Sequence, residues 1–235
     1  MAGFGDAFAQ AAGLALGLDG ELLGIVGLSL AVSLSATALA CLVGLPLGAL
    51  LAVTRFPGRS AAVAVLNALM GLPPVVVGLS VYLLVSASGP LGPLRLLYTP
   101  AAMILAQAIL VTPIVAALTR ETVAALDAEY DEYLRTLDAG PLFRVGTLLW
   151  DGRFALTTAA LAGLGRALAE VGAVMIVGGN IAHSTRVMTT AIALETSKGE
   201  LAMALALGAI LVTLSLAVTA AVTGVRLRAE AAAHA

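Results

Sequence analysis

Long apolar runs alternate with short polar intervals along this chain. Five of the runs approach or exceed the roughly 20 residues that an α-helix needs to cross the hydrocarbon of a bilayer. We expect membrane spans at residues 22–53, 61–86, 101–118, 154–177 and 200–225. The pattern therefore predicts an all-α integral membrane protein of about five transmembrane helices, organised as a single domain over residues 1–235.

Two prolines interrupt the second run. Pro73 and Pro74 remove two consecutive backbone donors, so a helix that passes through them must deform. Irregular backbone at membrane depth is tolerated only where protein or a water-lined cavity satisfies it. The pair is therefore a candidate for the substrate path, and a packing kink without any substrate role is the alternative.

The longest polar interval, residues 120–153, separates the third span from the fourth. Apolar residues in its first half recur at helical spacing and predict one apolar helix face: Leu126, Tyr130, Leu134 and Leu137. Gly140 and Pro141 should end this helix, and a second short apolar run follows at residues 142–150. Two short helices joined by a turn offer a surface to a partner protein; a solvated loop is the alternative.

Two ionisable residues lie inside the fourth span. Arg166 and Glu170 are four positions apart, which places them on one face of a continuous helix. Charges at membrane depth normally face the protein interior or water. Either Arg166 lines a path for an anion while Glu170 holds its side chain, or the two form a self-neutralising structural pair. Asn180, which follows two glycines, could offer its amide to substrate or cap the helix end.

Composition narrows the function. The chain is 60% hydrophobic and 11% charged, with a formal net charge of −2, which places it in a membrane and argues against a nucleic-acid partner. The sole lysine, Lys198, is not followed by Ser or Thr, so the chain has no phosphate-binding loop of its own. Cys41 is a single cysteine, and His183 and His234 are far apart. We expect no catalytic residues, no metal site and no cofactor, with membrane lipid as the surroundings.

Basic residues predict the orientation, because cytoplasmic loops carry an excess of them. Eight lie on one side of the predicted spans and three on the other. With the richer side inside, the N-terminus lies outside and the C-terminus is cytoplasmic. A short helix predicted over residues 187–199 then lies against the external face. It could contact a substrate-delivering protein or pack only on its own spans.

Four motifs resemble one family: FPGR at residues 56–59, GLPPVVVGL at 71–79, GRALAEVGAVMIVGGNI at 165–181 and TRVMTTAIALETSKG at 185–199. They are similar to permease subunits of ABC importers for tungstate, with molybdate permeases next. Residues 120–153 resemble the cytoplasmic coupling loop of that family, whose motif reads Glu-Ala-Ala, later Gly, and then Ile-x-Leu-Pro. Glu132 begins the triplet at the Glu-Ala-Ala place. Asp138 stands where Gly is usual, with Gly140 just beyond it, and Asp151 stands where Pro is usual.

The resemblance implies a type I ABC importer permease fold in a bacterial or archaeal cell (inner) membrane. It implies a second copy of the chain as homodimer partner, an ATP-binding ABC subunit and an extracytoplasmic oxyanion-binding protein. The residues expected to couple to the ATPase are Glu132, Leu134, Leu137, Asp138 and Gly140. The candidates for the substrate path are Pro73, Pro74, Arg166, Glu170 and Asn180. The alternatives are a secondary anion transporter, driven by an ion gradient, and a non-transporting membrane anchor subunit.

Overall fold

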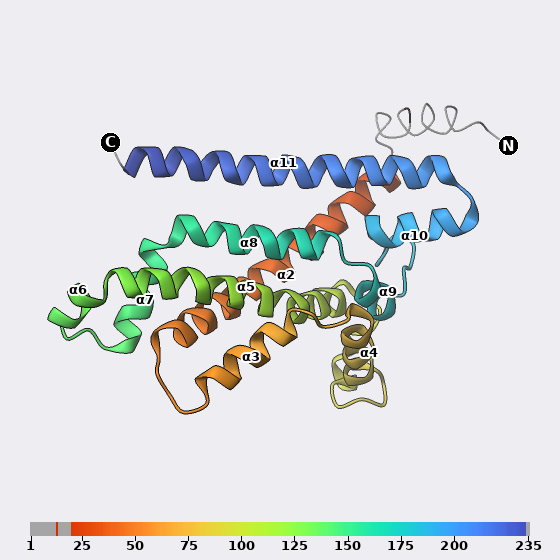
Figure 1. The fold of residues 1–235 in the computed structure, drawn as a ribbon. Helices are drawn as coiled ribbons and strands as arrows, with labels where there is room; N and C mark the ends of the chain where they lie inside the picture. Colours follow the sequence, from red (N-terminus) through yellow and green to blue (C-terminus); the bar gives the residue numbers. More distant parts are fainter. Residues whose placement is uncertain (1–12, 14–19, 234–235) are drawn as a thin grey trace. The chain divides into compact units, whose positions relative to one another are not determined.

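The computed structural model describes Gly13 and residues 20–233, and this part of the chain forms helices and no β-strand (Figure 1). The elements are α2 (Gly20–Val53), α3 (Arg59–Leu69), α4 (Pro74–Val85), the 3₁₀ turn η1 (Gly92–Leu94), α5 (Pro100–Glu129), α6 (Asp131–Thr136), α7 (Pro141–Asp151), α8 (Arg153–Leu168), α9 (Gly172–Gly178), α10 (Met188–Lys198) and α11 (Leu201–Ala233).

Three of these helices, α2, α5 and α11, are long and apolar enough to cross a membrane. The number rises to five when the pairs α3/α4 and α8/α9 each count as one broken span. The break between α3 and α4 lies at residues 70–73, where the two prolines predicted it. Helix α5 continues to Glu129, beyond the predicted end at residue 118, because neither glycine nor proline interrupts the sequence after Pro113.

Packing groups the chain into two compact units. Unit 1 comprises Met1–Ser35, Pro73–Gln107 and Ala167–Ala220, and unit 2 comprises Ala36–Leu72, Ala108–Arg166 and Ala221–Ala235. Helices α2, α5, α8 and α11 each supply residues to both units. The single-domain organisation therefore stays a prediction.

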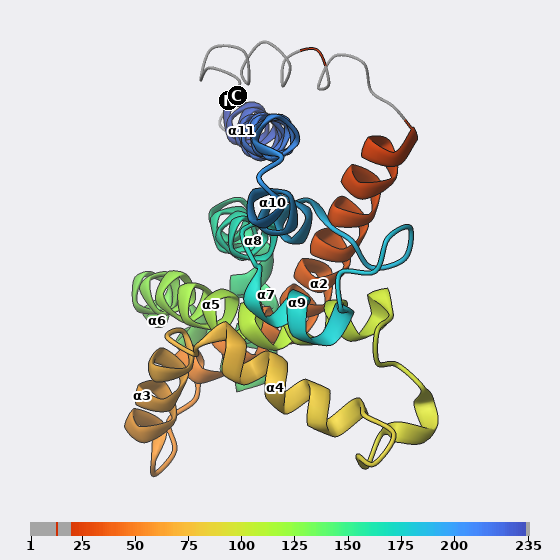
Figure 2. The same cartoon turned by 90° about the vertical axis from the view of Figure 1, so that its right-hand side faces the viewer.

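In unit 1, α4 packs against α9 (Figure 2). A Cβ added at Gly78 would lie 2.8 Å from Cα of Ala173, so these two backbones approach more closely than any side chain would allow. The predicted helix at 187–199 is confirmed as α10, and Gly199, at φ 84, ends it in the left-handed conformation. The apolar side of α10 is buried against the starts of α2 and α11, in a cluster of Leu22, Met188, Ala191 and Leu207.

In unit 2, glycines permit close approach to α5 from two sides. A Cβ added at Gly48 of α2 would collide with the carbonyl oxygen of Ala116. A Cβ added at Gly163 of α8 would lie 2.8 Å from Cγ1 of Val111. Small residues at helix contacts are how membrane helices gain van der Waals packing in the absence of a hydrophobic driving force.

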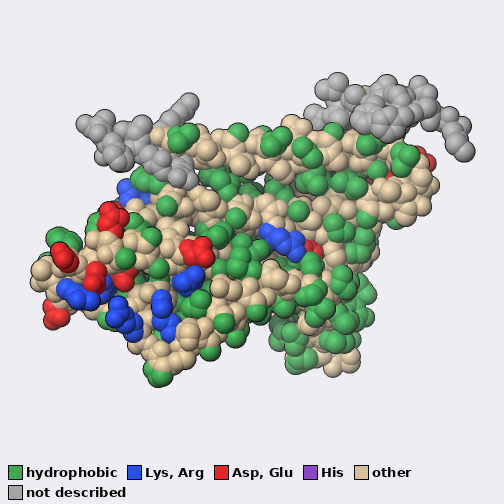
Figure 3. Space-filling view, viewed as in Figure 1, with side chains coloured by type: hydrophobic (Ala, Val, Ile, Leu, Met, Phe, Trp, Pro, Cys, Tyr) green, Lys and Arg blue, Asp and Glu red, His purple; other side chains and the backbone are tan. Residues whose placement is uncertain are grey.

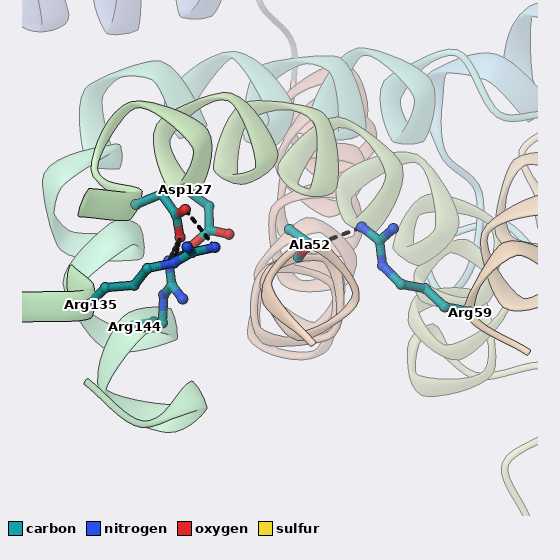
Figure 4. A network of polar contacts seen from close by, with 6 residues as sticks. Ala52, Arg59, Asp127, Arg135 and Arg144 are labelled. Carbon is teal, nitrogen blue, oxygen red and sulfur yellow. Dashed lines mark hydrogen bonds and ion pairs between the residues drawn. The ribbon is translucent and has the colours of Figure 1, made fainter. Parts of the chain in front are cut away.

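The turn between α2 and α3 is held by Arg59 (Figure 4). Its Nε donates to the carbonyl of Leu51 at 2.8 Å, and its Nη2 donates to the carbonyl of Ala52 at 3.1 Å. The last carbonyls of a helix have no partner within the helix, and Arg59 supplies two donors for them. Gly58, at φ 91, provides the reversal that brings Arg59 back to α2. The FPGR motif therefore ends one helix and begins the next.

Apolar side chains cover much of the face seen in Figure 3. The most apolar window of α11 is only 17% buried within the chain, against 56% for that of α5. Soluble monomers rarely expose continuous apolar surface of this kind. The exposed apolar helices are those of a multi-pass membrane protein.

Candidate functional site

The 120–153 segment is built on a buried leucine. Leu134, the fourth residue of α6, is 2% exposed and belongs to a cluster with residues from α2, α5 and α7: Ala49, Ala52, Val123, Val145 and Leu148. We expected Leu134 on a free apolar face together with Leu137, and for Leu134 this was wrong. A helix of six residues is not stable in isolation. Its buried residue, Leu134, therefore packs against the rest of the chain and stabilises α6.

A left-handed residue ends α6. The N–H of Asp138 donates to the carbonyl of Arg135, and the N–H of Ala139 donates to the carbonyl of Leu134, both at 3.0 Å. Asp138 has φ 48. These two bonds around one left-handed residue form a Schellman motif, in which glycine is the usual occupant. Asp138 thus adopts the conformation that glycine would favour at this position.

Gly140 and Pro141 begin α7 instead of ending α6, which corrects the expectation from sequence. Gly140 is the N-cap residue and Pro141 is the first helical residue, where the missing N–H of proline costs nothing. Val145 and Leu148 turn inward and join the cluster around Leu134. The two short helices are therefore fixed relative to the ends of α2 and α5 within unit 2.

The opposite sides of α6 and α7 are exposed. Leu137 is 54% exposed, and four more large apolar or aromatic side chains of this segment are exposed with it: Tyr133, Leu142, Phe143 and Trp150. Glu132 is also exposed. An exposed group of large apolar side chains beside charged ones is the composition of a protein-binding surface. We call Glu132, Tyr133, Leu137, Leu142 and Phe143 the α6–α7 surface.

An ion network ties α5, α6 and α7 together (Figure 4). Nη2 of Arg144 lies 3.0 Å from a carboxylate oxygen of Asp127 and 2.9 Å from one of Asp131. Asp131 also pairs with Arg135 at 2.9 Å. The hydrogen bond from Arg144 is the main cause that lowers the pKa of Asp131, and the charge of Arg135 adds to it. Charged side chains gather at this end of unit 2 in Figure 3.

A second contact joins the end of α5 to the end of α7. A hydrogen bond with Asp151 raises the pKa of the Tyr130 hydroxyl. Asp151 is the last residue of α7. Asp151, which stands where the coupling-loop motif usually has proline, thus accepts a hydrogen bond from Tyr130.

Pro73 and Pro74 sit at the start of α4. Pro73 is the N-cap residue and Pro74 is the first helical residue. Gly71 and Leu72 precede them outside both helices. The break in the second span is confirmed, and its role in a substrate path stays a prediction.

Arg166 and Glu170 do not share a continuous helix, which corrects the sequence-based argument. Helix α8 ends at Leu168, so Arg166 lies in its last turn and Glu170 lies in the break before α9. Glu170 is buried, and its Oε1 accepts a hydrogen bond from the N–H of Ala173 at 3.0 Å. It therefore satisfies one of the backbone donors at the start of α9 that have no partner within the helix.

Asn180 follows the end of α9. Gly179 is the C-cap residue at φ 70, and Asn180 also has a positive φ of 50. The side-chain Nδ2 of Asn180 lies 3.4 Å from the carbonyl of Thr190. Its Oδ1 is buried and has no hydrogen-bond partner among the described residues. Glycine, not Asn180, caps the helix, and contact of this amide with substrate stays a prediction.

Sequence reasoning missed the polar residues that satisfy the break between α8 and α9. Nε2 of Gln107, from α5, donates to the carbonyl of Ala167 at 3.0 Å. The hydroxyl of Thr189, from α10, donates to the carbonyl of Glu170 at 2.8 Å. A glutamine in the middle of an apolar run was the available signal, because polar side chains at membrane depth usually have a specific partner.

Helix α10 borders a pocket of about 290 Å³ in unit 1. Charged side chains of both signs line it: Glu21, Arg186, Glu195, Lys198 and Glu200. Arg186 lies 3.7 Å from Glu21, and Lys198 pairs with Glu195 at 2.9 Å. Within the described residues, no group of His, Cys, Asp and Glu side chains has the arrangement of a metal site.

The chain is similar to several membrane permeases. The tungstate uptake system permease of Peptoclostridium acidaminophilum is 41% identical over 217 residues, which cover 92% of this chain and 95% of that protein. A probable anion ABC transporter permease of Haloferax volcanii is 41% identical over 204 residues, 85% of this chain and 88% of that one. The molybdenum transport system permease of Azotobacter vinelandii is 30% identical over 178 residues, 72% and 79% of the two chains. No protein-family model matches the sequence.

Proposed function

Because the chain belongs to the ABC-transporter permeases of the tungstate and molybdate family, we propose that it is the membrane-spanning subunit of an ATP-driven importer for an oxyanion. Tungstate is the proposed substrate, and molybdate is the next candidate. The observation that carries this proposal is the 41% identity to a tungstate permease along 92% of the chain, against 30% along 72% for the molybdenum permease. The chain itself is a transport subunit and not an enzyme.

The α6–α7 surface is the proposed docking site for a separate ATP-binding subunit. Its exposed apolar side chains, such as Leu137 and Phe143, offer area to bury in a groove of the partner. Glu132 adds a directional, charge-assisted hydrogen bond. Leu134, Asp138 and Gly140 position this surface, since they anchor α6, end it and begin α7.

The architecture supports transmission of force through this surface. Leu134 and Val145 join the two short helices to the ends of α2 and α5 through one buried cluster. Arg144 adds ion pairs to Asp127 on α5 and Asp131 on α6. A partner that moved α6 would therefore move the ends of the membrane helices with it, which is what an ATP-driven permease requires.

The proposed assembly pairs two copies of the chain around the anion path, with an oxyanion-binding protein on the external side. The N-terminus is proposed to lie outside and the C-terminus inside. The distribution of basic residues supports this orientation, because the segments predicted inside carry eight of them and those predicted outside carry three. The charged pocket beside α10 is the proposed contact for the binding protein.

Uptake by the reconstituted complex tests the function. Proteoliposomes that carry the permease, its ATPase and the binding protein should take up tungstate only with ATP, and molybdate should compete better than sulfate. Uptake driven by an ion gradient without ATP would instead show a secondary transporter. Absence of uptake despite bound, active ATPase would show an anchor subunit.

Glu132→Ala tests the docking surface. We expect the permease dimer to remain intact while stimulation of the ATPase by loaded binding protein falls by roughly tenfold or more, since a charge-assisted bond is worth roughly 1.5–3 kcal/mol. Glu129→Ala, which removes another exposed carboxylate from the end of α5, is the matched control and should leave stimulation unchanged. Equal stimulation in both variants would exclude Glu132 from coupling.

A further inference from the structure

A small cavity in unit 1 adjoins the break between α8 and α9. Its volume is about 10 Å³, and its polar lining comes from Ser29, Ser33, Gln107 and Thr189. Gln107 is 3% exposed. Its Nε2 is bonded to the carbonyl of Ala167, but its Oε1 is buried without a hydrogen-bond partner among the described residues.

The hydroxyl groups of Ser29 and Thr189, which line the same cavity, do not donate to this oxygen, because their protons are used elsewhere. The hydroxyl of Ser29 donates to the carbonyl of Ile25 at 2.7 Å and accepts from the N–H of Met188 at 2.7 Å. The hydroxyl of Thr189 donates to the carbonyl of Glu170. Each of these oxygens keeps a lone pair, so the cavity presents acceptors to anything inside it.

We propose that this cavity is a binding site for one water molecule, which donates one proton to Oε1 of Gln107 and the other to a hydroxyl oxygen of Ser29 or Thr189. A buried carbonyl oxygen without a partner is costly, so a donor there stabilises the fold. A cavity of about 10 Å³ is close to the roughly 10–15 Å³ that one water needs, and its polar groups fall within the range of two to four partners.

The water adds hydrogen bonds beside the break between α8 and α9, where the helical backbone hydrogen bonds are interrupted. Gln107 reaches the end of α8, and Thr189 reaches the break itself. A water bound to Gln107 and to one of the two hydroxyl groups links α5 to α10 or to α2 beside the irregular backbone. Such a link satisfies the rule that non-helical backbone at membrane depth is tolerated only where protein or water completes its hydrogen bonds.

A monovalent cation is the competing occupant, because oxygen acceptors also coordinate sodium. The polar lining of the cavity is made of neutral side chains. Transfer of an unpaired ion into such a site would cost far more than transfer of water. This distinction bears on the mechanism, since a bound cation is what a transporter driven by an ion gradient would need.

A structure of the intact permease in lipid, at a resolution that shows ordered water, tests the proposal directly. We expect one solvent peak within hydrogen-bond distance of Oε1 of Gln107, with no anomalous signal after soaking in thallium(I). The melting temperature should be the same in sodium chloride and in choline chloride at equal ionic strength. An empty cavity, a thallium peak, or stabilisation by sodium would overturn the proposal.

Ser33→Thr provides a second test that needs no direct image of the water. The change keeps the hydroxyl and adds a methyl group at the cavity, which should displace the water and lower the melting temperature. Ser35→Thr makes the same change at an exposed position of α2 and is the matched control. If the cavity is dry, the added methyl fills it, and Ser33→Thr would be at least as stable as Ser35→Thr.

Discussion

The turn between α6 and α7 and the break between α8 and α9 both interrupt helical structure, but different polar contacts stabilise them. At the first, Arg144 pairs with two carboxylates in a partly exposed network. At the second, the neutral side chains of Gln107 and Thr189 donate to backbone carbonyls, and the buried carboxylate of Glu170 accepts from a backbone N–H of α9. Near water a pair of charges loses little solvation, whereas at membrane depth each charge is expensive. Ion pairs between side chains therefore hold the partly exposed turn, whereas side-chain bonds to the backbone hold the buried break.

The largest effect expected from this comparison is at Leu134. Leu134→Asp places a carboxylate inside the apolar cluster that anchors α6, and it should cost at least the roughly 2–5 kcal/mol of a buried Leu→Ala change. Leu137→Asp makes the same change three residues away on the exposed side, and its effect on stability should be within about 0.5 kcal/mol. Limited proteolysis of residues 120–153 and the melting temperature measure both; similar values would contradict the assignment of the two faces.

Removal of Arg144 should have the next largest effect. Arg144→Met leaves Asp127 and Asp131 without their shared partner and should cost roughly 1–3 kcal/mol. Arg135→Met removes a cation whose side chain is 66% exposed, so its cost should be at most about 1 kcal/mol. Thermal unfolding in nanodiscs compares them. If Arg135→Met proved the more damaging variant, the network would not be centred on Arg144.

Removal of the Thr189 hydroxyl tests how much its hydrogen bond stabilises the break between α8 and α9. Thr189→Val keeps the shape of the side chain but removes the hydrogen bond to the carbonyl of Glu170, with an expected cost of about 1–2 kcal/mol. Thr196→Val is the matched control on the exposed side of α10. Hydrogen exchange at the amides of α9 should rise in the first variant only. Unchanged exchange would mean that this bond does not hold the break.

Acidification should weaken the charged turn. The pKa of Asp131 is lowered in the folded state, mainly by its hydrogen bond from Arg144. Its contribution to stability is therefore complete above the unfolded pKa near 3.9 and is lost as the pH falls through the lowered folded pKa. Hydrogen exchange of residues 131–151 should rise over this range, and Arg144→Met should flatten the dependence. A profile identical in the two proteins would contradict the origin of the shift.

The smallest effect concerns Asp138. Because its φ of 48 suits glycine better than a residue with a Cβ, Asp138→Gly should stabilise the turn, by up to roughly 1 kcal/mol. Asp138→Val, which places a branched Cβ in the same conformation, should destabilise it. The melting temperatures of the two variants should fall on either side of the parent protein. The opposite order would mean that the carboxylate of Asp138 makes a contact worth more than the strain.

Local signals in the sequence predicted much of the fold. The apolar runs predicted the long helices, the paired prolines located the break before α4, and the pattern ending at Lys198-Gly199 predicted α10. These features depend on residues close together in the chain. Helix α5 extends beyond its predicted end because no breaker follows Pro113.

Contacts between distant residues decided the rest. The spacing of apolar residues within α6 could not predict which side is buried. The partners of Leu134 lie on three other helices, between Ala49 of α2 and Leu148 of α7. The helix through Arg166 and Glu170 looked continuous because nothing nearby breaks it. The helix instead breaks after Leu168. Gln107 and Thr189, which lie far away in sequence, donate to backbone carbonyls at this break.

The hydrogen bonds of Arg59 have a mechanical consequence. They join the first residue of α3 to the last turn of α2, across a turn of only a few residues. Because these two hydrogen bonds hold Arg59 against the end of α2, we expect the turn to resist bending between α2 and α3. A displacement of α3 is therefore passed to the end of α2, and from there to Leu134 through Ala52 of the same cluster. The short FPGR turn therefore couples α3 to the buried cluster that anchors α6 and α7.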